Sequence, residues 1–197
     1  MYINTTRSSM LFESQRFENK DFGNSPLTAG DYEECNFEHC DFTNSNLSNY
    51  SFTDCLFNKC LFNLTKSGNT GFRNVTFKEC KIQGIHFEDC NPFLFSISFN
   101  KCVIRVSSFC KMDMRLVFFD HCILNEIDFS ESNLTSVKFD GCDLDRSVFW
   151  NTNLEKSDFR TAFNFSIDPE RNRLKKAKFS SMGAHGLLEK YGLDIEF

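Results

Sequence analysis

The chain contains little proline, which interrupts regular secondary structure, and little tryptophan and tyrosine. Among 197 residues there are three Pro, one Trp and four Tyr, and no long apolar run occurs. Without such a run the sequence has no candidate segment for crossing a bilayer, and the start at Met1 lacks the basic and apolar regions of a secretory signal. We therefore expect a cytoplasmic protein with no membrane partner, whose ten Cys are reduced and behave as small apolar residues.

Motifs that carry enzyme chemistry are missing as well. The sequence contains no glycine-rich phosphate loop, no HExxH zinc pattern and no GxSxG serine motif. Cysteines five residues apart, such as Cys35 and Cys40, do not have the spacing of zinc-binding pairs. The sequence therefore predicts a protein that is not an enzyme, with no catalytic residue, metal, cofactor or small-molecule substrate.

Phenylalanine, by contrast, is abundant and periodic. It occurs 25 times, and every fifth residue from Phe12 to Phe87 is apolar except Ser67. A second series, displaced by two residues, runs from Leu94 to Phe159. A period of five fits neither an α-helix nor a flat strand. A small residue, often Cys or Ser, recurs two positions before many of the central residues. Large and small residues that alternate inward are typical of a narrow, filled tube.

These five-residue units resemble a known family. Cys40–Asn44 (CDFTN) and Ser45–Asn49 (SNLSN) are similar to the A(D/N)LXX pattern of pentapeptide-repeat proteins, and the resemblance extends over about residues 12–160. It implies an all-β fold, a right-handed quadrilateral parallel β-helix in which each pentapeptide forms one side and twenty residues complete a coil. Residues twenty apart, such as Phe37 and Phe57, should then stack about 4.8 Å apart.

The periodicity divides the chain into three parts. Residues 1–11 precede it and are expected to cap the first coil, because a coiled β-rod has open edges at its ends. Residues 12–167 form the predicted β-helix. Residues 168–197 form a last coil followed by a short helix at 186–192, with Gly192 as its C-terminal cap.

Two irregularities lie inside the predicted β-helix. Residues 64–71 contain two Gly and no central apolar residue, so they form either a degenerate side or a short projecting loop. At residues 88–94 the frame shifts by two positions. We expect an outward bulge at Pro92 there, because proline cannot donate a hydrogen bond to a central ladder.

The C-terminal segment resembles a more specific group. Residues 174–180 (LKKAKFS) and 186–193 (GLLEKYGL) are similar to the tail of the Qnr quinolone-resistance proteins. The resemblance implies that this element joins two rods tail to tail into a homodimer; the alternative is a cap folded onto its own rod. The residues expected at the dimer contact are Leu187, Leu188, Tyr191, Leu193, Ile195 and Phe197.

Charge is unevenly distributed around a net value of −5. Residues 1–63 and 120–160 each hold nine acidic and four basic side chains, whereas residues 64–119 hold eight basic and four acidic ones. The resemblance to Qnr proteins implies a rod like duplex DNA in shape and charge, which binds DNA gyrase or topoisomerase IV, without contacting nucleic acid itself, and protects it from quinolones. The expected partner-binding residues are Glu33, Glu34, Glu38, Asp41, Asp54, Asp128, Asp140, Asp143, Asp145 and Asp158.

A second class of function fits the same composition. A structural or scaffolding β-helical rod with another protein partner would need the same filled core and charged exterior. A gyrase supercoiling assay separates the two hypotheses, because only the first predicts an effect on the enzyme.

Overall fold

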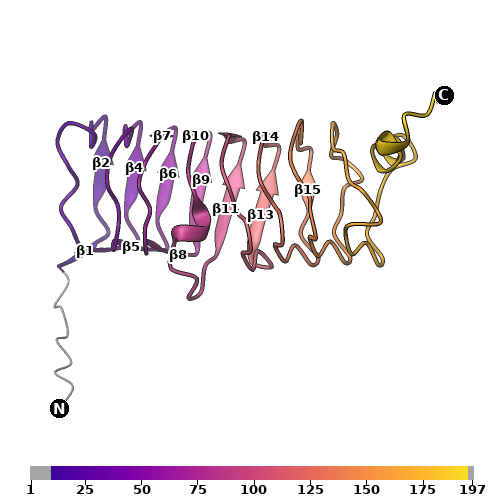
Figure 1. Cartoon of the computed structure of the whole chain (residues 1–197). Coiled ribbons are helices and arrows are strands. Elements are labelled where there is room, and N and C mark those ends of the chain that lie inside the picture. Colours follow the sequence, from indigo (N-terminus) through magenta and orange to yellow (C-terminus); the bar gives the residue numbers. More distant parts are fainter. Residues whose placement is uncertain (1–9, 195–197) are drawn as a thin grey trace, which may run out of the picture.

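The chain winds into a rod of stacked coils (Figure 1). The structure is a computed structural model and describes residues 10–194. Neighbouring coils pair in parallel with a register of twenty residues, so that Phe37 lies opposite both Phe17 and Phe57. The predicted all-β fold, a quadrilateral parallel β-helix, is therefore confirmed, and with it the inward orientation of the five-residue columns.

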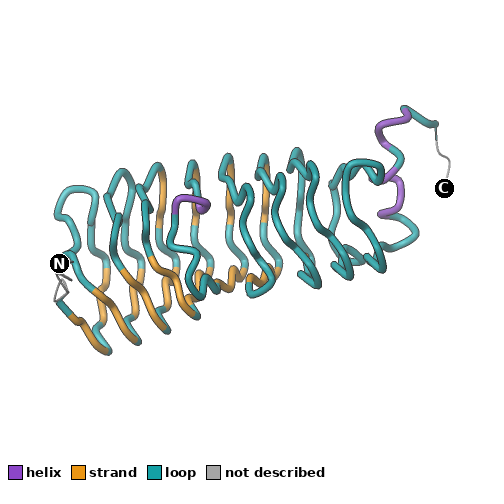
Figure 2. The backbone as a smooth tube through the Cα atoms, turned by 60° about the horizontal axis from the view of Figure 1, so that its bottom comes forward, coloured by secondary structure: helices purple, strands orange, loops and turns teal. Residues whose placement is uncertain are grey.

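Short strands form the sides of the coils, with tight corners between them (Figure 2). The strands are β1 (Leu11–Glu13), β2 (Arg16–Glu18), β3 (Asp31–Glu33), β4 (Asn36–Glu38), β5 (Ser51–Thr53), β6 (Leu56–Asn58), β7 (Leu61–Asn63), β8 (Gly71–Arg73), β9 (Val75–Lys78), β10 (Lys81–Gln83), β11 (Ile97–Asn100), β12 (Val103–Arg105), β13 (Val117–Asp120), β14 (Ile123–Asn125) and β15 (Phe139–Asp140). Three short 3-10 helices complete the described elements: η1 (Phe87–Asp89), η2 (Gly183–Leu187) and η3 (Glu189–Tyr191).

Each of the four sides has its own column of inward residues, and we name the sides after the order in the first coil. Side A begins with Phe12 and contains the sheet β1-β3-β5-β8. Side B begins with Phe17 and contains the seven-stranded sheet from β2 to β15. Side C begins with Phe22 and contains β7-β10-β12-β14, and side D begins with Leu27 and pairs only through single bridges such as Asn46 with Lys66.

Stacked Phe rings fill the interior along the rod. On side B nine rings from Phe17 to Phe179 form one column, with neighbouring centroids 4.7 to 5.4 Å apart. Rings on adjacent sides meet edge to face, as Phe57 and Phe62 do at 5.3 Å. Burial of each Phe stabilises the fold by about 1.5–3 kcal/mol, so the core itself holds the coils together.

The corners between sides require a left-handed backbone. Along most of the rod the residue two positions after a central residue has a positive φ, for example Asn44 (58°), Asn49 (66°) and Val106 (47°). Asn tolerates this conformation because its short side chain bonds locally, whereas a β-branched residue such as Val106 is strained there. This repeated bend after every five residues gives the coil its square section.

Residues 64–71 continue the coil and do not form a projecting loop. Ser67 lies in the inward column of side D with only 7% of its surface exposed. The hydroxyls of Thr65 and Thr70 donate to the backbone carbonyls of Phe42 and Leu47 at 2.8 and 2.7 Å, in the coil before. Small polar residues can therefore replace apolar ones in this segment, because the adjacent coil satisfies their hydrogen bonds.

The frame shift lies on side A just after η1. Phe93 and Leu94 are 64% and 58% exposed, and the buried residue on this side is Phe95. The expectation that Leu94 starts the second inward series is therefore wrong: two extra residues loop outward (Figure 1), and Phe95 turns back to the core. The rings of Phe77 and Phe99 still stack at 5.3 Å across the shift, so side B continues without interruption.

The C-terminal segment forms a last partial coil and a compact cap. Phe179 stacks on Phe159 at 5.2 Å, and η2 and η3 then fold over the end of the rod. The predicted short helix is thus two 3-10 turns, which glycine-rich Gly183–Leu187 favours because glycine destabilises a regular α-helix. Gly192 does cap η3 with a φ of 58°. Of the expected N-terminal cap at 1–11, residues 1–9 lie outside the described residues, and Leu11 begins β1.

Candidate interaction surfaces

The ten acidic residues expected at a partner surface do not share one face. They project from all four sides of the rod and are divided as follows: Glu33, Glu34 and Asp54 on side A, Glu38, Asp140 and Asp158 on side B, Asp41, Asp143 and Asp145 on side C, and Asp128 on side D. The structure therefore brings together only subsets of the predicted set.

Carboxylates stack in register on the first two coils. Glu13 lies opposite Glu33 on side A, Glu18 opposite Glu38 on side B, and Asp21 opposite Asp41 on side C. We call these six residues the N-terminal acidic surface. Glu13, Glu18 and Asp21 were not predicted, although the twenty-residue spacing, applied to charged as well as apolar positions, identifies them.

Few basic groups compensate the N-terminal acidic surface. Residues 10–49 hold eight acidic side chains against Arg16 and Lys20. Arg16 forms an ion pair with Glu18, and Asn58 donates to both oxygens of Glu38 at 2.8 and 2.9 Å. Among the described residues, no Lys or Arg forms an ion pair with Glu13 or Glu33.

Several of the other predicted acids are compensated within the rod. Asp158 lies 2.7 Å from Arg160, which holds the pKa of this carboxyl below its usual range. Asp145 faces Arg146 at 3.8 Å, and Asn164 donates to Asp143 at 2.9 Å. The charge imbalance is larger on the first two coils, where residues 10–49 hold eight acidic and two basic side chains, than in residues 120–160, which hold nine and four.

The C-terminal cap covers the end of its own rod and also exposes apolar side chains. Leu187 packs against the core, and Gly186 lies so close to Phe165 that a Cβ at this position would clash with the Phe165 carbonyl oxygen. Leu188, Tyr191 and Leu193 are 38%, 54% and 57% exposed. Of the six expected dimer residues, Ile195 and Phe197 lie outside the described part of the chain.

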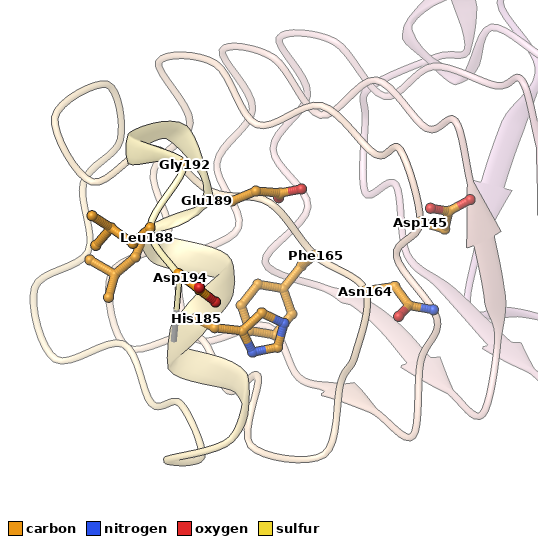
Figure 3. Close-up of a pocket in the computed structure, with 9 residues that line it drawn as sticks. Asp145, Asn164, Phe165, His185, Leu188, Glu189, Gly192 and Asp194 are labelled. Carbon is orange, nitrogen blue, oxygen red and sulfur yellow. The ribbon is translucent and has the colours of Figure 1, made fainter. Parts of the chain in front are cut away.

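A pocket of about 570 Å³ separates this cap from the last coils (Figure 3). Asp145, Asn164 and Phe165 line it from the coils, and His185 and Glu189 line it from the cap. Beside it, Lys190 lies 2.6 Å from Asp168 and 2.8 Å from Glu170. These contacts lower the pKa of both carboxyls and raise that of Lys190, so charge attraction holds η3 against the turn at 168–170.

The bulge at 92–95 forms a second exposed apolar region. Phe93, Leu94 and Leu116 are each more than half exposed, and the guanidinium of Arg73 lies 5.6 Å from the Phe93 ring centroid. Grooves of about 660 and 410 Å³ lie between the bulge and the next coil. The sequence predicted a bulge here but not that it would expose a large aromatic side chain.

The thiols are placed for packing. Eight of the ten Cys are in the inward small positions of sides B and C, and Cys60 Sγ donates to the carbonyl oxygen of Phe37 at 3.3 Å. Burial raises the pKa of Cys55 to about 12 and also raises that of Cys80, so both thiols are neutral at physiological pH. Within residues 10–194 no cluster of three or more metal-ligating side chains occurs. In the same range no helix is long and apolar enough to span a membrane.

A rod of five-residue sides with a filled core defines a pentapeptide-repeat protein. Residues 30–109 match the family described as a pentapeptide repeat region, and residues 119–151 match the one described as pentapeptide repeats in eight copies. Together these segments cover more than half of the chain, which therefore belongs to the pentapeptide-repeat family.

Solved structures of this family give distant matches. Trypsin-treated QnrB1, a plasmid-mediated fluoroquinolone resistance protein, is 17% identical over 95% of this chain and 98% of its own, with a TM-score of 0.47. HetL, a pentapeptide repeat protein involved in heterocyst differentiation regulation in the cyanobacterium Nostoc, is 11% identical over 87% of each chain, with a TM-score of 0.43. No curated protein matches the sequence.

Proposed function

We propose that this chain is a non-catalytic binding protein whose N-terminal acidic surface occupies the basic DNA-binding surface of a type II topoisomerase, DNA gyrase or topoisomerase IV. The observation that carries the proposal is the stacking of carboxylates in register on three adjacent sides, Glu13 with Glu33, Glu18 with Glu38 and Asp21 with Asp41. In this function the rod takes the place of DNA on the enzyme.

The stacked carboxylates are electrostatically unfavourable in the isolated rod. Like charges directly opposite each other on paired strands destabilise a sheet, and here the strand spacing is about 4.8 Å. A partner with Lys and Arg side chains relieves this repulsion. Phosphates along one DNA strand are about 3.4 Å apart along the helix axis. The stacked carboxylates of the rod therefore present a DNA-binding surface with negative charges at a spacing similar to that of DNA.

The choice of enzyme rests on the resemblance of residues 174–180 and 186–193 to the Qnr tail. In keeping with that resemblance, we propose a homodimer joined tail to tail through the exposed side chains of Leu188, Tyr191 and Leu193. Such a dimer carries its two acidic surfaces at opposite ends. Binding of this kind would protect the enzyme from quinolones in the cytoplasm, where reduced thiols are expected.

A supercoiling assay with DNA gyrase and ciprofloxacin tests the proposal. We expect the purified chain to restore supercoiling, and the double variant Glu13→Gln with Glu33→Gln to need about tenfold more protein, because two surface charge contacts together contribute about 1.4 kcal/mol. The matched control is Glu126→Gln with Glu131→Gln, because these carboxylates already face Arg146 and Lys111. Absence of any effect of the wild-type chain on the enzyme would refute the proposal.

A scaffolding rod with a different protein partner is the second candidate. The exposed Phe93, Leu94 and Leu116 favour it, because an apolar patch of this kind on a soluble rod usually marks a contact with protein. Affinity capture from the source cell distinguishes the candidates: recovery of topoisomerase subunits that is lost in the Glu13→Gln, Glu33→Gln variant supports the first.

A further inference from the structure

Side A has opposite charge at its two ends. The coil of Tyr32 exposes Glu33 and Glu34, whereas the coil of Leu174 exposes Arg173, Lys175 and Lys176. Successive inward residues on this side are Tyr32, Phe52, Phe72, Phe95, Met114, Leu134, Leu154 and Leu174. The acidic and basic coils are therefore seven steps apart, or about 34 Å at the usual strand spacing.

The exposed apolar bulge lies at the centre of that distance. Phe95 is three steps from Tyr32 and four from Leu174, so the midpoint of side A falls between the bulge and the coil of Met114. Phe93 and Leu94 project on one side of this midpoint, and Leu116 is exposed on the other. The grooves between bulge and coil open at the same place.

The backbone explains why the grooves stay open. In the next coil Asn133 donates its N–H to Met112 and accepts from the N–H of Met114, both at close to 2.9 Å. One coil earlier, Asp113 occupies the position of Asn133, and Pro92 occupies the position of Met114. Pro92 would have to donate to the carbonyl of Asp113, but proline has no N–H. Within the described chain, no backbone hydrogen bond joins residues 91–96 to residues 112–116.

We propose that side A binds side A of a second copy of this chain, antiparallel and about a two-fold axis between the bulge and the coil of Met114. This axis places Glu33 and Glu34 of one copy opposite Lys175 and Lys176 of the other, twice. It also places Phe93 and Leu94 of each bulge over the Met114 coil of its partner, which exposes Leu116, and the grooves of the two copies face each other at the axis. The same patch on both copies is then self-complementary in charge and in shape, as an isologous interface requires.

The contact is confined to one side of a thin rod, so its area is at the low end for protein interfaces and the association is weak. Charge attraction supplies orientation, and the central apolar contact supplies the buried area. We expect the association to weaken in 0.5 M salt, because screening shortens the reach of exposed charges to a few ångströms. The inference shares Glu33 with the N-terminal acidic surface, but its basic coil lies outside that surface, so variants of Lys175 and Lys176 test it without altering the proposed enzyme contact.

Charge reversal in sedimentation equilibrium at low salt tests the proposal. All chains carry Leu188→Asp, which removes the tail contact, and the expected result for this parent is a dimer. The pairs Glu33→Lys, Glu34→Lys and Lys175→Glu, Lys176→Glu should each weaken association more than tenfold. An equimolar mixture of the two variants should restore it, because both contacts of the mixed dimer again join opposite charges. A monomeric parent, or a mixture no tighter than its components, would overturn the proposal.

The apolar contact has its own variant and control. Phe93→Ser with Leu94→Ser should weaken the parent dimer about tenfold, whereas Phe118→Ser, which is equally exposed but on side B, should leave it unchanged. Equal effects of the two would contradict the placement on side A. In the wild-type background, with Leu188 retained, Lys175→Glu with Lys176→Glu leaves the N-terminal acidic surface and the tail contact intact, so gyrase protection should persist. This result separates failure of the present inference from failure of the proposed function.

Discussion

The first and second parts of the rod follow the same five-residue plan but build their sides differently. Residues 11–125 contain fourteen strands, whereas the described residues beyond 125 contain only β15. In the second part the residue before the centre is often Asp or Asn, and its side chain accepts the backbone N–H two positions on, as Asp128 does from Ser130 at 2.8 Å and Asn133 from Thr135 at 3.2 Å. These local bonds turn the side and compete with the ladder.

Leu, Arg or Val before the centre offers no such bond, and these sides stay extended, as in β2, β6 and β12. Asn36 shows that neighbours also matter. It lies in β4, paired on both sides with strands, and its side-chain oxygen is buried without a partner. The core therefore sets the coil, while the outward residue before the centre and the strands beside it together determine whether a side is a strand or a turn.

The largest effect should come from the core, and it should be equal in the two parts. Phe57→Ala in the strand-rich part and Phe129→Ala in the turn-rich part should each lower the free energy of unfolding by about 3–5 kcal/mol, because both rings are fully buried. Urea denaturation followed by circular dichroism measures this. Phe118→Ala, on an exposed ring, is the control and should cost little. A much smaller loss at Phe129 would mean that the turned sides pack a looser core.

A smaller effect tests the turn itself. Asn133→Ala should cost about 1 kcal/mol, because it removes bonds from the N–H and the hydroxyl of Thr135. Asn36→Ala is the matched control and should change stability by less than about 0.5 kcal/mol, because its oxygen has no partner to lose. Equal losses at the two positions, measured in the same urea experiment, would show that the side-chain bond does not decide the geometry.

The sequence was sufficient for the fold because the inward columns are read directly from apolar residues at a stride of five. Leu94 was assigned to that column wrongly. After a two-residue insertion either Leu94 or Phe95 could be the inward residue, and the sequence does not distinguish them; in the structure Phe95 is the buried one. The tail was predicted as a helix because the segment is too short for its apolar spacing to distinguish an α-helix from 3-10 turns.

The acidic surface was harder to predict. Every outward position has the same period, so spacing of five indicates exposure but not which of four sides a carboxylate occupies. The predicted set consequently included Asp158, which Arg160 compensates, and omitted Glu13, which stacks on Glu33. The tail-to-tail contact through Leu188, Tyr191 and Leu193 stays a prediction.

The corners are common to both parts and allow a stabilising change. Val106 has a φ of 47° and is 56% exposed, so it is strained and packs little. Val106→Asn should raise stability by about 0.5–1 kcal/mol, because Asn adopts the left-handed conformation more readily. Gly84, in the preceding coil at the same corner, is the opposite case: its φ is 68° and a Cβ would lie 2.7 Å from Leu64 Cδ2, so Gly84→Ala should destabilise. A shift of the same sign for both variants in thermal unfolding would contradict this account.

The smallest effect concerns η3, which ion pairs hold against the turn at 168–170, whereas Leu187 of η2 packs against the core. Lys190 lowers the pKa of Asp168 and Glu170 below their ordinary values of 3.8 and 4.5. Because docking lowers the pKa of these two carboxyls, their ionised forms stabilise the docked state at pH values above the ordinary pKa values. This contribution is lost as the pH falls through the lowered pKa values. Nuclear magnetic resonance of the Tyr191 ring, whose hydroxyl donates to Glu170 at 3.2 Å, should therefore report a docked η3 at pH 6 and progressive release as the pH falls below 3.8, while the Phe signals of the coils stay unchanged. Lys190→Met should release η3 at both pH values, and a pH response identical to that of the wild type would show that the ion pairs do not hold it.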